Sequence, residues 1–247
     1  MTRRIAISGK GGSGKTTVAA MIIRSLLEGP DSGAVLAVDA DPNACLGATL
    51  GVQPVCTVAD IREGARAKSP SNAGMDKVRS VEYGIQQAIT EAHGFDLLTM
   101  GRPEGPGCYC AVNNMLRRFL DELGSQYEFV VIDNEAGMEH LSRRTTNHID
   151  LLCVVTEPTA IGEVTAQRII HLASQLPLTV KKIGVVWNRA STSKELNGID
   201  IFGQIPYDPS VSDASMQGKT VFDLEKDSPA LEAVTEILEH VLVLTCP

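Results

Sequence analysis

Residues 9–17 read GKGGSGKTT, which satisfies the pattern G-x-x-x-x-G-K-[ST] of a phosphate-binding loop. Glycines in such a loop let backbone N–H groups turn toward phosphate oxygens, and the helix that follows directs its positive end at them. We expect Lys15 to reach the outer phosphates and the Thr16 hydroxyl to hold Mg²⁺. The residues expected to bind ATP or ADP here are Gly11, Gly12, Ser13, Gly14, Lys15, Thr16 and Thr17.

The segments on either side of the loop have the order that the motif requires. Residues 4–8 form a short apolar run suited to a buried strand. Directly after the loop, apolar residues fall at helical spacing: Ala19, Ile22, Ile23, Leu26 and Leu27. A strand, a glycine loop and a helix in this order favour a phosphate-binding loop over an ordinary glycine-rich turn.

Apolar runs alternate with helical patterns along the rest of the chain. Further strands are expected at residues 34–39, 95–100, 127–133, 151–156, 182–187 and 201–205. Because these runs are continuously apolar and separated by helical stripes, they predict a parallel sheet covered on both faces. We therefore expect one α/β domain over residues 1–247, with a mostly parallel, twisted sheet and the ligand at the carboxyl ends of its strands.

Composition narrows the classes of function. The chain has 247 residues, 43% of them hydrophobic, and a net charge of −8, which disfavours a nucleic-acid or anionic-membrane partner. No apolar run is long enough to span a bilayer, and the N-terminal segment has no signal-peptide pattern. We expect a cytoplasmic protein whose six cysteines stay reduced, so that thiolate metal binding or redox chemistry is favoured over structural disulfides.

Carboxylates follow two of the expected strands. Asp133 ends the run YEFVVID, which is the setting of an aspartate near the magnesium ion of a phosphate-binding loop. Asp39 and Asp41 lie two residues apart in the segment VDADP at the end of the second strand. The segment from Asp41 to Asn43 is also typical of a helix-opening turn.

Lys10, directly after the first glycine, is not required by a plain phosphate-binding loop. The form KGGxGKT resembles the deviant Walker A motif of the ATPase class that contains MinD, ParA, ArsA and nitrogenase iron protein. This resemblance implies a homodimer that encloses nucleotide, in which Lys10 reaches the nucleotide of the partner subunit. It also implies that Asp41 lies near the attacking water and Asp39 near the metal shell.

The same resemblance implies further nucleotide contacts. Gly137, four residues after Asp133, matches the second switch, whose N–H contacts the γ-phosphate. Asn188 matches the position of an asparagine on the adenine edge, and Pro206, Tyr207 and Asp208 match a second base-contacting segment. Asn and Pro at strand ends are also common turn residues.

Cys108 and Cys110 form a C-x-C pair in a segment rich in glycine and proline. Two thiolates cannot close a tetrahedral metal site, but two chains around a dyad would supply four. Four thiolates suit Zn²⁺, an iron–sulfur cluster, or Ni²⁺ in square-planar geometry. The alternative is a pair of incidental or redox-active thiols.

Taken together, GKGGSGKTTVAA, VDADPNACLGATLG, GCYC and VVIDNEAGMEHL resemble the CooC-type ATPases over residues 5–242. This resemblance implies an ATP-hydrolysing metallochaperone that assists nickel insertion into carbon monoxide dehydrogenase or the related acetyl-CoA synthase. The motifs do not separate these two clients.

Other functions remain as alternatives. An iron–sulfur-carrying ATP-dependent reductase or cluster-assembly ATPase is the strongest, although no cysteine lies near the second switch. A MinD-like membrane positioner would end in a basic amphipathic helix, whereas the last helical stripe here is acidic. A ParA-like DNA-partition ATPase would need a basic surface.

Overall fold

The strands assemble where the apolar runs predict them. The computed structural model describes residues 2–29, 33–67, 84, 86–102, 124–135, 148–176 and 178–243. Its strands are β1 (Arg3–Gly9), β2 (Val35–Asp39), β3 (Ile89–Glu91), β4 (Phe95–Thr99), β5 (Phe129–Asp133), β6 (His148–Thr156), β7 (Thr179–Asn188) and β8 (Asp200–Ile205). Within the described chain they form an eight-stranded sheet in the order β3-β4-β2-β5-β1-β6-β7-β8, parallel except for the pair β3–β4.

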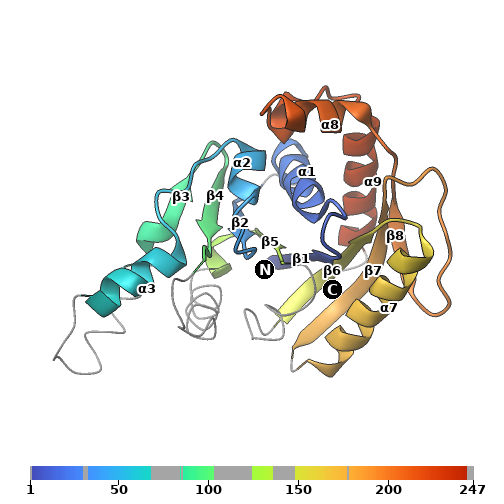
Figure 1. Ribbon diagram of the computed structural model, residues 1–247, viewed down its shortest axis with the longest axis horizontal. Coiled ribbons are helices and arrows are strands. Elements are labelled where there is room, and N and C mark those ends of the chain that lie inside the picture. The colour runs from blue at the N-terminus through green and yellow to red at the C-terminus, as the bar shows by residue number, and fades with distance from the viewer. Residues whose placement is uncertain are drawn as a thin grey trace.

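Helices cover both faces of this sheet (Figure 1). They are α1 (Lys15–Glu28), α2 (Leu46–Leu50), α3 (Val58–Ala67), α7 (Ala160–Gln175), α8 (Pro209–Met216) and α9 (Pro229–Val243), with short 3₁₀ turns η1 (Gly124–Gln126) and η2 (Val221–Asp223). Alternate side chains of each strand enter different cores. Ile5 and Ile7 pack with α1 and α9, whereas Ala6 lies in the core on the opposite face, which includes residues of α7. The predicted α/β domain with two covered faces is therefore confirmed.

The seven predicted strands are present, and two features differ from expectation. β3 was not predicted, because a three-residue antiparallel edge strand has no continuous apolar run. α8 was not predicted either, because none of its side chains is buried and its sequence has no apolar stripe. The available signal for α8 was its start, where Asp208 precedes a proline at the first helical position.

None of the helices in the described part of the chain is long and apolar enough to cross a membrane.

Candidate nucleotide-binding site

The phosphate loop leaves β1 at the centre of the sheet. β1 lies between β5 and β6; from β1 the chain continues to β2 on the β5 side of the sheet, whereas the later strands β6, β7 and β8 lie on the other side. In open parallel sheets such a reversal creates a crevice at the carboxyl ends of the strands, where ligands bind. The loop, the carboxylates after β2 and β5, and the segments after β7 and β8 all lie at this edge.

The loop backbone needs its glycines. Gly12 and Gly14 have φ values of 79° and 88°, in the left-handed region that glycine adopts without strain. A side chain at Gly9 would collide with the carbonyl oxygen of Val155 on β6. Gly14 precedes α1, whose first turn has no acidic residue and, among the described residues, no side-chain cap. The first N–H groups of α1 are therefore free to bind an anion.

The two lysines of the loop have different surroundings. Lys15 is buried, and its Nζ donates a hydrogen bond of 3.2 Å to the carbonyl oxygen of Lys10. The backbone N–H of Ser13 donates to the same oxygen at 3.2 Å. The side chain of Lys10 is exposed. Lys15 is thus held against its own loop, whereas Lys10 is available to a group outside the subunit.

Asp39 and Asp133 lie side by side because β2 and β5 are parallel neighbours in which these two residues are paired. Burial raises the pKa of Asp39 to about 7, and the charges of Asp133 and Asp41 add to this effect. Hydrogen bonds from the N–H groups of Leu46 (2.8 Å) and Asp41 (3.2 Å) oppose it. Burial also raises the pKa of Asp133, to about 6, although the Thr16 hydroxyl and the Lys15 ammonium lower it.

Both carboxylate oxygens of Asp133 are buried and have no hydrogen-bond partner of normal geometry among the described residues, although the Thr16 hydroxyl lies near enough to lower the pKa. Buried polar atoms of a protein are normally satisfied, so these oxygens are suited to bind a cation. Aspartate and hydroxyl oxygens are hard ligands of the kind that Mg²⁺ prefers. Thr16, Asp39 and Asp133 therefore fit a magnesium ion, bound directly or through water.

Asp41 has a local structural role in this state. Its Oδ1 accepts hydrogen bonds from the backbone N–H of Asn43 at 2.8 Å and from the side-chain Nδ2 of Asn43 at 2.9 Å. The turn that the sequence allowed is therefore present. Asp41 is only partly buried and follows Asp39 by two residues, so it lies beside the carboxylate pair.

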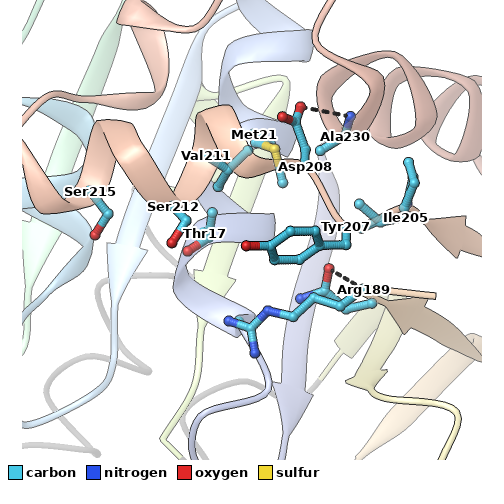
Figure 2. Close-up of a pocket in the computed structure, with 13 residues that line it drawn as sticks. Thr17, Met21, Arg189, Ile205, Tyr207, Asp208, Val211, Ser212, Ser215 and Ala230 are labelled. Atoms are coloured by element: carbon cyan, nitrogen blue, oxygen red, sulfur yellow. Dashed lines mark hydrogen bonds between the residues drawn. The ribbon is translucent and has the colours of Figure 1, made fainter. Parts of the chain in front are cut away.

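A cavity of about 340 Å³ opens beside the phosphate loop (Figure 2). Gly14 and Thr17 line it from the loop side, and apolar side chains such as Met21 and Val211 contribute to its wall. All four residues expected to contact the base line it as well: Asn188, Pro206, Tyr207 and Asp208. The Tyr207 ring is 62% exposed and lies over the space near Arg189.

Asn188 and Asp208, two of these residues, form hydrogen bonds with other groups of the protein. The Nδ2 of Asn188 donates to the carbonyl oxygen of Ser13 at 2.8 Å, and its Oδ1 accepts from the N–H of Arg189 at 3.0 Å. Asp208 accepts hydrogen bonds from Ser210 at the start of α8 and from Ser228 and Ala230 at the start of α9.

These hydrogen bonds hold the pKa of the buried Asp208 carboxyl below its usual range, although burial opposes them. The Asp208 carboxylate therefore holds the cavity wall in place through these hydrogen bonds. The exposed ring of Tyr207 is the part of this segment that is accessible to a ligand.

Some expected site residues lie outside the described residues: Gly137, Cys108 and Cys110. Conversely, the structure adds Arg189 to the cavity, which the sequence analysis missed. Arg189 has a left-handed backbone, with φ of 54°. Neither an arginine nor the residues beside it in the sequence predict this conformation. Only its position after Asn188 at a strand end pointed to it.

Comparison with known proteins bears on this site. The family model of the CobQ/CobB/MinD/ParA nucleotide-binding domain (CbiA) matches residues 5–221. The chain belongs to this family. As a member of the CobQ/CobB/MinD/ParA family it is an ATP-binding protein and an ATPase.

Relatives of this family cover nearly the whole chain. An uncharacterized ATP-binding protein of Methanocaldococcus jannaschii is 41% identical over 96% of this chain and 98% of its own. The carbon monoxide dehydrogenase accessory protein CooC of Rhodospirillum rubrum is 32% identical over 92% of this chain and 91% of its own. The septum site-determining protein MinD of Pyrococcus horikoshii, solved with Mg-ADP, is 25% identical with a TM-score of 0.70, covering 100% and 99% of the two chains.

Proposed function

We propose that this ATPase is a metallochaperone that dimerises around nucleotide and assists nickel insertion into carbon monoxide dehydrogenase or the related acetyl-CoA synthase. The observation that carries the proposal is the similarity to CooC along 92% of the chain, together with the C-x-C pair Cys108 and Cys110.

The phosphate loop binds the triphosphate of ATP through its backbone N–H groups, and Lys15 contacts the outer phosphates. Mg²⁺, held by Thr16, Asp39 and Asp133, supplies charge neutralisation at the phosphate oxygens. Asp41 orients the attacking water once it exchanges its contact with Asn43 for that water. Exposed Lys10 reaches the nucleotide of the partner subunit, so that hydrolysis requires the dimer.

The adenosine part occupies the cavity beside the loop. Its lining is mixed, with apolar side chains from α1 and α8 and an exposed tyrosine ring suited to stacking on a purine. Asn188, Pro206 and Asp208 hold the wall against which the base lies. Gly137 contributes its N–H to the γ-phosphate.

Nickel is the cargo in this proposal. Cys108 and Cys110 from each of two subunits supply four thiolates, and Zn²⁺ can occupy the same set. Closing the dimer on ATP brings the pairs together, and reopening after hydrolysis changes their geometry and releases the ion to the client enzyme.

Anaerobic metal binding tests this proposal. The wild-type protein should bind one Ni²⁺ per dimer, with affinity that falls at lower pH because the thiols must lose protons. Cys108→Ser and Cys110→Ser should abolish this site and leave ADP binding intact. Cys56→Ser is a matched control, since this partly buried thiol lies outside the nucleotide site. A double-serine protein that still binds one ion per dimer with unchanged affinity would contradict the proposal, and a visible absorption band would favour an iron–sulfur cluster instead.

The client is tested separately. Nickel-loaded protein and ATP should increase nickel content in metal-free carbon monoxide dehydrogenase or acetyl-CoA synthase, and the Lys10→Ala variant should not. Transfer to neither enzyme would remove the client from the proposal without affecting the ATPase assignment.

A further inference from the structure

Two consecutive residues at the end of β7 contact the phosphate loop from outside. Asn188 donates its Nδ2 to the carbonyl oxygen of Ser13 at 2.8 Å, and both groups are buried. Arg189 points its Nη1 toward the carbonyl oxygen of Gly12 at 3.4 Å. The same Nη1 contacts Glu157 Oε1, after β6, at 3.0 Å.

The backbone of Arg189 is adapted to this contact. Its φ of 54° places it in the left-handed region, where an arginine is uncommon and where strain is concentrated at functional sites. The Asn188 side chain accepts the Arg189 N–H and so stabilises this bend. The side chain of Gly14, were there one, would collide with Asn188 Nδ2, so the loop and the asparagine are in direct contact.

The chemistry of an anion-binding loop explains why such contacts matter. Its N–H groups must point inward, so its carbonyl groups point outward and need donors of their own. In this structure the carbonyl oxygen of Lys10 accepts hydrogen bonds from Lys15 Nζ and from the Ser13 N–H. Arg189 donates to the carbonyl oxygen of Gly12, and Asn188 donates to that of Ser13. The carbonyl groups of Lys10, Gly12 and Ser13 thus have donors.

We propose that Asn188 and Arg189 form a clamp that holds the phosphate loop in its phosphate-binding shape before nucleotide arrives. They are positioning residues, because they act through the carbonyl groups of Gly12 and Ser13. Glu157 anchors the arginine and thereby links the loop to the end of β6, the strand that lies between β1 and β7. Since both clamp residues also line the base cavity, occupancy of the cavity and order in the loop are coupled. The proposal rests on nucleotide binding at this loop and is independent of nickel transfer.

Amide hydrogen exchange of the nucleotide-free protein tests the clamp directly. Arg189→Gln should increase exchange of the Ser13 amide, which donates to the Lys10 carbonyl oxygen within residues 9–17, about 2- to 5-fold, the effect of losing an exposed ion pair. Asn188→Ala should increase it about tenfold or more, because the buried Ser13 carbonyl loses its donor. Lys194→Gln is the matched control, since its ion pair with Glu163 joins the same region to α7 without touching the loop.

Binding of magnesium tripolyphosphate separates a clamp from a base contact. Loss of the clamp should weaken tripolyphosphate binding, and should weaken Mg-ADP binding by at least the same factor, because both ligands need the loop and both clamp residues also line the base cavity. Tyr207→Ala should weaken Mg-ADP alone. Unchanged exchange at residues 9–17 in the clamp variants, or a loss confined to Mg-ADP, would overturn the proposal. A wild-type protein that bound no nucleotide would instead refute the proposed site, and the exchange experiment would still decide the clamp.

Discussion

The two sides of the phosphate loop differ in how their polar groups are satisfied. On the side of β2 and β5, Asp39 and Asp133 are buried together, their pKa values are raised, and the oxygens of Asp133 have no hydrogen-bond partner of normal geometry among the described residues. On the side of β7 and β8, Asn188 and Asp208 are also buried, but their side chains take part in hydrogen bonds within the protein. The first side is built to receive a cation and the second to hold its shape without one.

The largest expected effect separates the two lysines of the loop. Lys10→Ala should leave ATP bound but reduce turnover about 1000-fold, the scale of a charge supplied in trans to the transferred phosphate. Lys15→Ala should instead weaken ATP binding, because this buried ammonium belongs to the loop itself. Turnover at saturating ATP and equilibrium binding distinguish them. Normal turnover by the Lys10 variant would show that the reaction is completed within one subunit.

Asp41→Asn should reduce turnover about 100-fold and trap an ATP-bound dimer. The substitution removes the carboxylate beside the attacking water but spares Thr16, Asp39 and Asp133, so the closed state forms and persists. Size-exclusion chromatography with Mg-ATP measures the dimer, and wild-type protein with Mg-ADP is the control. A variant that remains monomeric or hydrolyses ATP normally would assign the water to another residue.

Removing the charge of the buried Asp39 carboxylate should increase the stability of the folded protein. Asp39 has its pKa raised from 3.8 to about 7, so the folded state is destabilised as pH rises between these values and by the full amount above them. Asp39→Asn should therefore increase the free energy of unfolding of the cation-free protein by about 2 kcal/mol at pH 8, and by little at pH 4. Urea denaturation at both pH values checks this, and an equal gain at both would contradict it.

Asp208, in the wall of the base cavity, should contribute to stability with the opposite pH dependence, and its substitution should have the smallest effect of these variants. The pKa of Asp208 is lowered, so its contribution to stability is complete above the ordinary value of 3.8 and is lost as pH falls through the folded value below it. Asp208→Asn should reduce the free energy of unfolding by about 1 kcal/mol at pH 7, because the amide can still cap α8 but has only one acceptor oxygen and cannot also accept from Ser228 and Ala230.

This difference should shrink in acid. Urea denaturation between pH 7 and about pH 2.5, which extends below the ordinary pKa of 3.8, measures it. Asp213→Asn, an exposed position on the same helix, is the control and should change little. A loss at Asp208 that persists undiminished in acid would mean that the carboxylate charge has no part in capping α8 and α9.

The sequence predicted those parts of the molecule that depend on local pattern. The glycine loop with its flanking strand and helix, the seven apolar strands and the carboxylates at their ends all follow from residue type and spacing. The close pairing of Asp39 with Asp133 follows from parallel strands in register.

Other features depend on tertiary contacts that no local pattern encodes. β3 is an edge strand of three residues, and α8 has no fully buried side chain. The left-handed bend at Arg189 arises because the strand end must meet the phosphate loop. The internal use of the Asn188 amide likewise depends on a loop 175 residues away.

The contacts of the Asp208 carboxylate also bear on how short a nucleotide-binding fragment of this ATPase can be. It joins the start of α8 to the start of α9, with Ser228 Oγ at 2.6 Å from its Oδ2. The family model ends at residue 221, before α9 begins at Pro229. A fragment cut at the boundary of the family model would keep every phosphate-loop residue and most of the cavity lining, yet lose Ser228 and Ala230, which donate hydrogen bonds to Asp208. We therefore expect the nucleotide-binding unit of this chain to extend past residue 221 and to include α9.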